Sequence, residues 1–280
     1  MSRDPDRARA WPGRRTGSRV TLPPEREEDK PVGRYDGRVV IVTGAGSGIG
    51  RATALRLAQE GASVACLDVA ADANVATAAE AAALGVKAHA LPCDVSDETA
   101  VIKAVDEVTA ELGQPWLLCN IAGIGRFAHT HEMSLADWNR IVSVNLTGTF
   151  LMSRACIPLL LETGGSIVNI ASVAGIKGQP YSAAYAASKG GVALFTRAIA
   201  VEYAVAGLRA NALAPGGIDT AITEHFEFPE GASMALLSRI MPYRAMGRPE
   251  DCAALIAFLG SDEAGYISGA IIPVDAAVAA

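Results

Sequence analysis

Tyr185 and Lys189 stand four residues apart in an alanine-rich stretch that predicts a helix. The i, i+4 spacing places the phenol and the ammonium on one helical face. A free tyrosine titrates near pH ~10, so a tyrosine that serves as a base near neutrality must have a lowered pKa. Lowering it by two or three units requires roughly 3–4 kcal/mol of anion stabilisation. A neighbouring cation can supply part of that stabilisation.

Two further side chains bear on this pair. Ser172 ends an apolar, strand-like run thirteen residues before Tyr185. Tyr181 lies one helical turn before Tyr185 and is a rival phenol. No lysine follows Tyr181 four residues on, so Tyr185 is the preferred base. Tyr181 is then expected to line the pocket or the start of the helix.

A glycine-rich loop, Thr-Gly-Ala-Gly-Ser-Gly-Ile-Gly at residues 43–50, follows the first apolar run and precedes a helical pattern. Glycine permits a sharp turn and a close approach of the backbone to a pyrophosphate. The N–H groups at the helix N-terminus then bind the phosphates. The order strand, loop, helix predicts a dinucleotide site, although glycine also caps ordinary turns.

Asp68 ends the second apolar run, near the offset at which an acidic side chain hydrogen-bonds the adenosine ribose hydroxyls. A carboxylate at this place repels a 2′-phosphate, and Val69 rather than an arginine follows it. We therefore expect NAD in preference to NADP. The alternative is that Asp68 is the N-cap of the following helix.

Short apolar runs and longer helical patterns alternate from residue 37 onward. We expect strands at residues 38–43, 63–68, 87–92, 116–120, 166–172, 208–214 and 270–274, and helices at 49–59, 72–84, 97–112, 134–161, 181–205 and 249–259. The strands are almost continuously apolar, as strands covered on both faces should be. The pattern predicts an α/β fold, a doubly wound parallel sheet of about seven strands with helices on both faces. It forms a single domain over residues 35–280.

Residues 1–34 are rich in arginine and proline, end in an acidic run and show no hydrophobic periodicity. We expect a disordered N-terminal arm that is not a secretory signal, because it has no apolar segment. A targeting or partner-binding role and a wrongly assigned start codon are the alternatives.

The composition narrows the functional class. Half of the 280 residues are apolar, and the net charge of −6 does not favour nucleic-acid binding. No apolar run was found to reach the roughly 18 residues of a membrane span. The five cysteines contain no CxxC pair, which indicates buried thiols in the cytoplasm rather than disulfides or zinc ligands. His129 and His131, two residues apart, indicate a solvated loop, and no metal is expected.

Taken together, these motifs resemble the short-chain dehydrogenase/reductase family from about Gly37 to Asp275. The matching stretches are residues 43–50, Asp94-Val95, Asn120-Ile121-Ala122-Gly123, Asn145, Ser172, Tyr185 to Lys189, Pro215-Gly216 and Thr220. The resemblance implies a Rossmann-like fold and hydride transfer between NAD and a secondary alcohol or ketone. It also implies a homo-oligomer, specifically a tetramer.

The resemblance also implies the roles of individual residues. Tyr185 would exchange a proton with the substrate oxygen and Ser172 would position that oxygen. Lys189 would hold the nicotinamide ribose and lower the pKa of Tyr185, while Asn145 would hold a water linked to Lys189. The residues expected to bind the cofactor are Gly44, Ser47, Gly48, Ile49, Gly50, Asp68, Asp94, Val95, Asn120, Gly123, Tyr185, Lys189, Pro215, Gly216, Ile218 and Thr220.

Several residues admit a second interpretation. Asn145 could bend its helix and be satisfied by a backbone carbonyl, and Asn120 could brace the fourth strand. Two positions depart from the family pattern: Ile121 replaces an asparagine, and Ala276-Ala277 replaces a glycine pair.

The long segment at residues 218–248 carries a set of large apolar side chains. They are Phe226, Phe228, Met234, Leu236, Leu237 and Met241. The segment predicts either a cover over an apolar, steroid-like substrate or ordinary packing against the sheet.

Three functional hypotheses remain. The first is an NAD-linked dehydrogenase that acts on a small-molecule secondary alcohol or on a hydroxysteroid. The second is an NADPH-dependent carbonyl reductase similar to the 3-oxoacyl-carrier-protein reductases, against which Asp68 argues. The third is a non-catalytic NAD(H)-sensing protein, which would need none of Asn145, Ser172, Tyr185 and Lys189.

Overall fold

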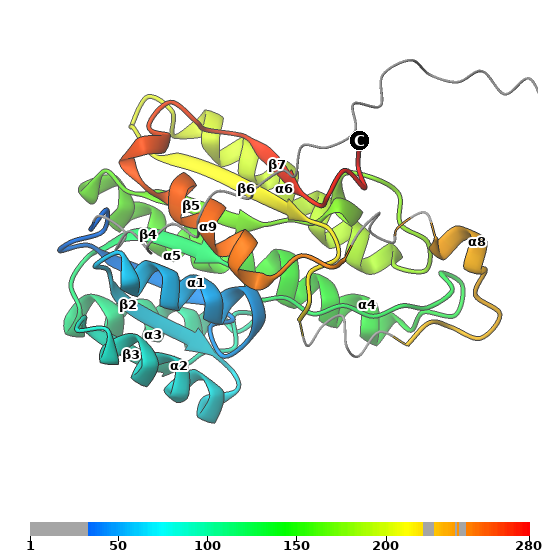
Figure 1. Ribbon diagram of the computed structural model, residues 1–280, viewed down its shortest axis with the longest axis horizontal. Helices are drawn as coiled ribbons and strands as arrows, with labels where there is room; N and C mark the ends of the chain where they lie inside the picture. Colours follow the sequence, from blue (N-terminus) through cyan, green and yellow to red (C-terminus); the bar gives the residue numbers. More distant parts are fainter. Residues whose placement is uncertain (1–32, 221–226, 239, 241–244) are drawn as a thin grey trace, which may run out of the picture. The chain divides into compact units, whose positions relative to one another are not determined.

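The computed structural model describes residues 33–220, 227–238, 240 and 245–280. In these residues seven strands form one sheet in the order β3-β2-β1-β4-β5-β6-β7, and every neighbouring pair is parallel (Figure 1). The strands are β1 Val39–Thr43, β2 Ser63–Asp68, β3 Ala88–Pro92, β4 Pro115–Asn120, β5 Ser166–Ile170, β6 Arg209–Pro215 and β7 Ile271–Val274. The strand order reverses between β1 and β4, and ligands of open α/β sheets bind at such a point.

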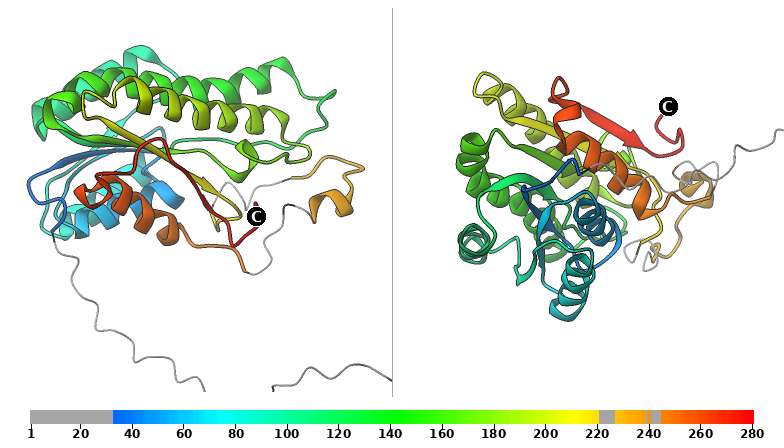
Figure 2. Two further views of the ribbon diagram at one scale, coloured as in Figure 1. Left: turned by 90° about the horizontal axis from the view of Figure 1, so that it is seen from above. Right: turned by 60° about the vertical axis from the view of Figure 1, so that its left-hand side comes forward.

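Helices cover both faces of the sheet, as the left view of Figure 2 shows. One layer consists of α1 Gly48–Gln59, α2 Ala71–Ala83 and α9 Pro249–Gly260. The other consists of α3 Glu98–Glu111, the α4–α5 helix and α6 Ala183–Glu202. A separate cluster of buried apolar side chains fills each interface. The predicted fold class and each predicted strand and long helix are confirmed, and no end differs by more than three residues.

The helix predicted at residues 134–161 contains a segment of different geometry. It runs as α4 Leu135–Val142, a π-helical turn Ser143–Thr147 and α5 Gly148–Thr163. The pattern Ser134-Leu-Ala-Asp137 predicts a capping box at its start. The cap is present, since the Ser134 hydroxyl accepts a hydrogen bond of 3.0 Å from the Asp137 N–H. Single π turns are frequent at functional sites, and Asn145 lies in this one.

The same helix contains no continuous apolar run of the roughly 18 residues of a membrane span, but by length and composition it is apolar enough to cross a membrane. Of its most apolar 18-residue window, 56% is buried inside the fold, and α5 packs on β4 and β5. Such burial is typical of a core helix.

Three short helices were not predicted: the 3-10 turns Val173–Gly175 and Asp262–Ala264, and α8 Met234–Leu237. They are too short to produce a hydrophobic periodicity. At the other end of the chain, residues 1–32 of the expected arm lie outside the described residues. Arg34, placed in that arm, instead donates two hydrogen bonds of 2.7 Å to the buried Glu60. The folded domain therefore includes Gly33 and Arg34.

Candidate active site

A cavity of about 520 Å³ opens at the carboxyl ends of the strands. Most of the predicted site residues line it, namely Gly44, Ser47, Gly48, Ile49, Gly50, Asp68, Asp94, Val95, Gly123, Ser172, Tyr185, Lys189, Pro215, Gly216, Ile218 and Thr220. The structure describes Asn120 and Asn145 as well, but neither of them lines this cavity. One cavity thus joins the glycine loop to the Tyr185 phenol.

The glycine loop between β1 and α1 is tightly packed. A Cβ on Gly50 would lie 1.9 Å from the Gly44 carbonyl oxygen, and Gly44 itself has φ +68°. A Cβ on Gly44 would lie 2.9 Å from the Ala122 Cα. Ser47, the N-cap of α1, makes no side-chain cap bond to the first turn. The loop therefore fits a phosphate group bound by the N–H groups of that turn.

Asp68, at the end of β2, is held by the backbone around it. Its Oδ2 accepts a hydrogen bond of 2.8 Å from the Gly46 N–H, and its Oδ1 accepts one of 2.8 Å from the Ala70 N–H. Ala70, not Asp68, is the N-cap residue of α2. A carboxylate has about four acceptor sites, so Asp68 retains capacity for ribose hydroxyls.

Asp94 and Val95 lie where the adenine was expected. The Asp94 Oδ1 accepts hydrogen bonds from the Ser96 hydroxyl and N–H, and Arg140 lies 3.5 Å from its Oδ2. The Ser96 hydroxyl is the main cause that lowers the pKa of Asp94, with a smaller effect from Arg140. Val95 is buried against Gly148, where a Cβ would lie 2.6 Å from the valine Cγ2.

Tyr185 and Ser172 meet at the centre of the cavity wall. Ser172 follows β5 and caps the next turn, since its Oγ accepts a hydrogen bond of 3.1 Å from the Ala174 N–H. Burial raises the pKa of the Tyr185 phenol, and a hydrogen bond with Ser172 pulls that pKa back down. Ser172 and Tyr185 can therefore both reach one substrate oxygen.

Lys189 is buried one helical turn beyond Tyr185. Its Nζ donates a hydrogen bond of 2.7 Å to the Ile170 carbonyl and lies 5.9 Å from the centre of the Tyr185 ring. Burial lowers the pKa of Lys189 to about 8. The Lys189 Nζ is thus directed to a backbone carbonyl, and the lowering of the Tyr185 pKa by Lys189 stays a prediction.

Asn145, in the π turn, is fully buried and connects two segments. Its Oδ1 accepts a hydrogen bond of 2.8 Å from the Ile124 N–H, and its Nδ2 donates to the Ile124 carbonyl (2.9 Å) and the Ser188 hydroxyl (3.1 Å). A Cβ on Gly123 would lie 3.3 Å from both Asn145 Oδ1 and Lys189 Nζ. Asn145 thus holds the loop after β4 beside Lys189, and the predicted contact with a backbone carbonyl is part of that arrangement.

Asn120 lies behind the cavity, within the sheet. Its Nδ2 donates hydrogen bonds to the Asn169 Oδ1 (2.9 Å) and the Ser153 hydroxyl (3.1 Å). Asn169 in turn donates to the Thr196 hydroxyl of α6. The structure therefore places Asn120 as a brace between β4, β5 and the helices above them.

Tyr181 and His129 lie beside the cavity rather than in its described wall. The Tyr181 phenol accepts a hydrogen bond of 2.8 Å from the Ser233 N–H, and its backbone has φ +62°. The His129 ring lies 5.2 Å from the Tyr181 ring, with its Nε2 3.0 Å from the Glu230 carbonyl oxygen. His129 is therefore partly buried in its loop, and His131 is exposed, as expected of a solvated loop.

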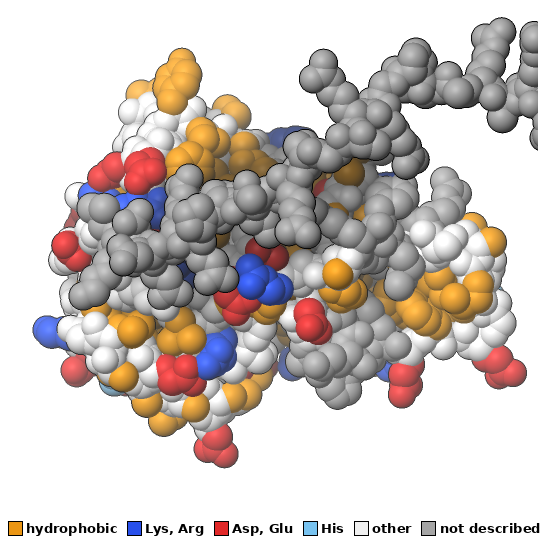
Figure 3. Space-filling model, in the orientation of Figure 1, with side chains coloured by type: hydrophobic (Ala, Val, Ile, Leu, Met, Phe, Trp, Pro, Cys, Tyr) orange, Lys and Arg blue, Asp and Glu red, His pale blue; other side chains and the backbone are white. Residues whose placement is uncertain are grey.

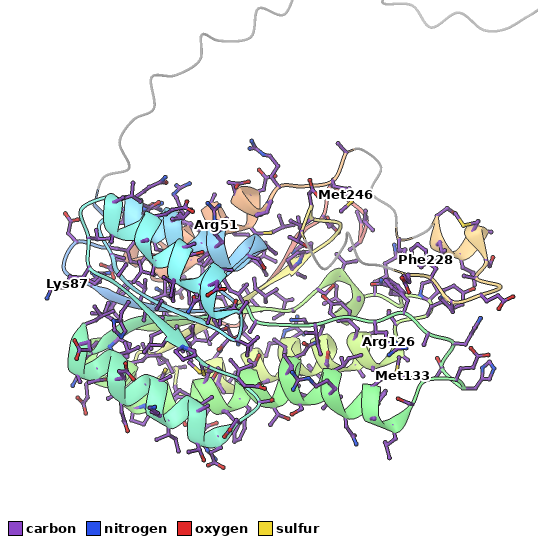
Figure 4. The ribbon with its side chains drawn as sticks, turned by 90° about the horizontal axis from the view of Figure 1, so that it is seen from below. Arg51, Lys87, Arg126, Met133, Phe228 and Met246 are labelled. Atoms are coloured by element: carbon purple, nitrogen blue, oxygen red, sulfur yellow. The ribbon has the colours of Figure 1, made fainter. Side chains whose placement is uncertain are left out.

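The long segment before α9 contributes part of the cover that the sequence predicted. Phe228, Ile240 and Met246 line the cavity, and Phe228 packs edge-on against Phe127 at 5.0 Å. Figure 4 shows Phe228 and Met246 at the same end of the sheet. Met234 and Leu236 are exposed and belong to the apolar surface around α8 on the right of Figure 3. Leu237 is buried, and Phe226 and Met241 lie outside the described residues.

The residues of the cavity wall that sequence reasoning missed include Arg140, Lys177, Gln179 and Val278. They come from a helix, a loop and the C-terminal tail, and none belongs to a recognisable motif. The backbone of the tail shows why a glycine pair suits the positions of Ala276 and Ala277. Both have positive φ (52° and 72°), the conformation that a glycine pair adopts without cost.

The cysteines are all buried and unbonded, with pKa values raised by burial. Among the described residues there is no group of three potential metal ligands.

Comparison with protein families places this cavity among known oxidoreductases. A family model described as "Enoyl-(Acyl carrier protein) reductase" matches residues 44–278. The 3-oxoacyl-(acyl-carrier-protein) reductase FabG of Thermotoga maritima is 41% identical over 243 residues, 86% of this chain and 98% of that protein. The cis-4-hydroxycyclohexanecarboxylate dehydrogenase of Sinomonas cyclohexanicum is 42% identical over 241 residues, 85% of this chain and 95% of that protein.

Solved structures agree with these relatives. A 3-ketoacyl-(acyl-carrier-protein) reductase from Brucella melitensis complexed with NADH is 33% identical and aligns with a TM-score of 0.80. The alignment covers 88% of this chain and 99% of that one. A short chain dehydrogenase from Mycobacterium paratuberculosis bound to NAD is 29% identical, with a TM-score of 0.81 over 88% of this chain and 99% of that one.

Proposed function

Because the chain belongs to the short-chain dehydrogenase/reductase family, we propose that it oxidises a secondary alcohol to the ketone with NAD⁺. It is an oxidoreductase acting on CH–OH groups, as its dehydrogenase and reductase relatives are. The observation that carries the proposed chemistry is that Ser172, Tyr185 and Lys189 line one cavity that extends to Asp68.

The proposed mechanism assigns one task to each side chain. Tyr185 takes the proton of the alcohol hydroxyl, and Ser172 hydrogen-bonds and orients that oxygen. When bound, the nicotinamide cofactor accepts the hydride from the carbon. Lys189, bonded to Ile170, holds the nicotinamide ribose, and Asn145 fixes the loop beside Lys189 and holds a water there. All four are proposed as the catalytic set.

The cofactor is proposed to be NAD rather than NADP. The glycine loop at Gly44 and Gly50 fits a pyrophosphate, and the Asp68 carboxylate at the end of β2 repels a 2′-phosphate. Asp94, Val95 and Gly123 would hold the adenosine half of the cofactor. Pro215, Gly216, Ile218 and Thr220 line the same cavity and would hold the nicotinamide half.

The substrate is proposed to be an apolar secondary alcohol. Val173, Phe228, Ile240, Met246 and Val278 give the cavity an apolar wall. Reduction of a 3-oxoacyl thioester is the second candidate, favoured by the 41% identity to the FabG relative. Asp68 disfavours it, because reductive biosynthesis draws on NADPH.

One assay compares the two candidates. A panel of cyclic and linear secondary alcohols is incubated with NAD⁺ or NADP⁺, and the corresponding ketones with NADH or NADPH. The reaction is followed by the absorbance of the reduced nicotinamide. We expect turnover of cyclic alcohols with a kcat/KM at least about tenfold higher for NAD⁺. A strong preference for NADPH with 3-oxoacyl thioesters would replace the first candidate by the second. Cofactor binding without any turnover would favour a sensor.

We further propose that the protein is a cytoplasmic homotetramer. Exposed apolar side chains lie along the α4–α5 helix and α6, including Leu135, Phe150, Leu194 and Val201. In the described residues β7 pairs on one side only, with β6. An apolar helical face and an open strand edge are the surfaces that closed symmetric contacts cover.

A further inference from the structure

Lys177 lines the cavity five residues after Ser172, yet the proposed hydride transfer gives it no task. It follows the 3-10 turn that Ser172 caps, and its N–H donates a hydrogen bond of 2.9 Å to the Val173 carbonyl. The turn is packed directly on α6, because a Cβ on Gly175 would lie 2.5 Å from the Lys189 carbonyl carbon. Lys177 is therefore attached to the same rigid unit as the catalytic side chains.

The ammonium of Lys177 is anchored but not neutralised. Its Nζ donates a hydrogen bond of 2.6 Å to the carbonyl oxygen of Val278, in the C-terminal tail. A carbonyl carries no net charge, and an ammonium has three donors, so the positive charge and two N–H groups remain. No ion pair among the described residues includes Lys177.

The Val278 carbonyl is itself held in place. The Asp275 carboxylate accepts hydrogen bonds from the N–H groups of Ala277 (3.0 Å) and Ala279 (2.7 Å). The Val278 side chain is buried against the cavity. The Asp275 carboxylate of the tail is thus engaged with the backbone, and the tail holds Lys177 at the cavity wall.

The other cations of the described wall have partners or tasks. Arg140 lies 3.5 Å from the Asp94 carboxylate, and Lys189 is bonded to the Ile170 carbonyl within the catalytic set. Lys177 is therefore a positive charge set among apolar side chains, including Val173 and Val278. An electrostatic contact is stronger beside apolar walls than in open water.

We propose that Lys177 binds a carboxylate of the substrate, so that the enzyme acts on secondary alcohols carrying a carboxylate remote from the hydroxyl group. The proposal rests on the dehydrogenase function above. Lys177 is then a specificity-determining residue of the same cavity. The apolar wall receives the hydrocarbon part of such a hydroxy acid, Tyr185 and Ser172 receive its hydroxyl, and Lys177 receives its charged end.

The test measures charge recognition separately from turnover. The substrates are 4-hydroxycyclohexanecarboxylate, the neutral carboxamide of the same shape, and cyclohexanol, with 4-hydroxypentanoate and its amide as a linear pair. The proteins are the unaltered chain, Lys177→Met, Lys177→Arg and the control Lys87→Met. Lys87 is an exposed lysine of the loop before β3, at the other end of the molecule (Figure 4).

We expect the unaltered enzyme to show a kcat/KM about tenfold higher for a carboxylate than for its amide. Lys177→Met should abolish that preference and leave turnover of cyclohexanol within about twofold, while Lys177→Arg and Lys87→Met preserve the preference. Equal rates with carboxylate and amide in the unaltered enzyme would overturn the proposal. A uniform loss with all substrates in Lys177→Met would also overturn it, because it would show that Lys177 serves only to hold the tail.

These outcomes are separable from the dehydrogenase function. Turnover of the neutral alcohols without a preference for carboxylates rejects the role of Lys177 alone. Absence of NADH formation with every alcohol, together with absence of ketone reduction, rejects the proposed function itself.

Discussion

At the scale of single residues, burial acts on the two central side chains in opposite ways. It raises the pKa of the Tyr185 phenol and lowers that of the Lys189 ammonium to about 8, because a dry site disfavours every charged form. The Ser172 hydroxyl opposes burial at Tyr185. The base form of Tyr185 is therefore stabilised by hydrogen bonding, and the Lys189 charge is directed to the Ile170 carbonyl.

The first prediction concerns the phenol. Tyr185→Phe should lower kcat by at least about 1,000-fold, because it removes the proton-transferring group. NADH binding, measured by fluorescence titration, should change by less than about threefold. Tyr181→Phe is the matched control, since it loses only the acceptor for the Ser233 N–H and should keep most of the activity. Substantial activity in Tyr185→Phe would place the base elsewhere.

The second prediction concerns pH and stability. The folded-state pKa of Lys189 lies near 8, below the unfolded value, so the unfolded chain binds more protons between about pH 8 and 10. The contribution of Lys189 to the free energy of unfolding is therefore lowest below about pH 8 and rises as the pH increases from about 8 to 10. The Tm difference between the unaltered protein and Lys189→Met should therefore change in favour of the unaltered protein from pH 8 to 10. A difference that stays constant across this range contradicts the buried-ammonium interpretation.

At the scale of elements, two local geometries position the site. The π turn within the α4–α5 helix presents Asn145 to Ile124 and Ser188, so one amide fixes a loop to α6. The glycine loop brings the backbone of α1 against that of β1, with no space for a Cβ at Gly50. At Gly50 the close contact is possible because the residue has no side chain. At Asn145 it is possible because the π turn departs from regular α-helical hydrogen bonding.

The third prediction tests the loop. Gly50→Ala should weaken NADH binding by at least about tenfold and lower the Tm, because a Cβ 1.9 Å from the Gly44 oxygen forces the backbone to move. Gly178→Ala provides the control, since a Cβ there meets no atom within 4 Å. Both variants are compared by fluorescence titration and thermal unfolding. Unchanged NADH affinity in Gly50→Ala would remove the loop from the cofactor site.

At the scale of the whole molecule, the exposed apolar side chains are unevenly distributed. Leu194 and Val201 of α6 and Phe150 of α5 share the helical layer over β4 to β6, and Phe150 packs against Phe195 at 6.4 Å. A continuous apolar helical face of this kind is typical of a subunit contact. The layer of α1, α2 and α9 also exposes Val75, which provides a comparison.

The fourth prediction follows from this distribution. Leu194→Glu should shift the protein from a tetramer to a smaller species, because a carboxylate cannot be buried without a partner. Val75→Glu, also an apolar-to-acid change on an exposed helix, should leave the assembly intact. Light scattering coupled to gel filtration gives both masses. A monomeric unaltered protein would contradict the proposed assembly directly.

The sequence alone determined those features of the fold and of the site that depend on residues close together along the chain. Apolar runs specified the buried strands, and the glycine loop, the Ser134 cap and the spacing of Tyr185 and Lys189 all act within one or two turns of chain. These features follow from local sterics and periodicity, which are properties of a short segment. Asp68 was placed correctly at the end of β2 for the same reason.

Only the tertiary structure decided which distant groups meet. The Lys177 ammonium and the Val278 carbonyl are 101 residues apart in sequence, and Lys189 donates a hydrogen bond to the carbonyl of Ile170 in β5, 19 residues before it. The π turn at Asn145 and the inward position of Asn120 also arise from packing between elements. Such contacts depend on how close two segments come after folding, and no spacing along the chain encodes that distance.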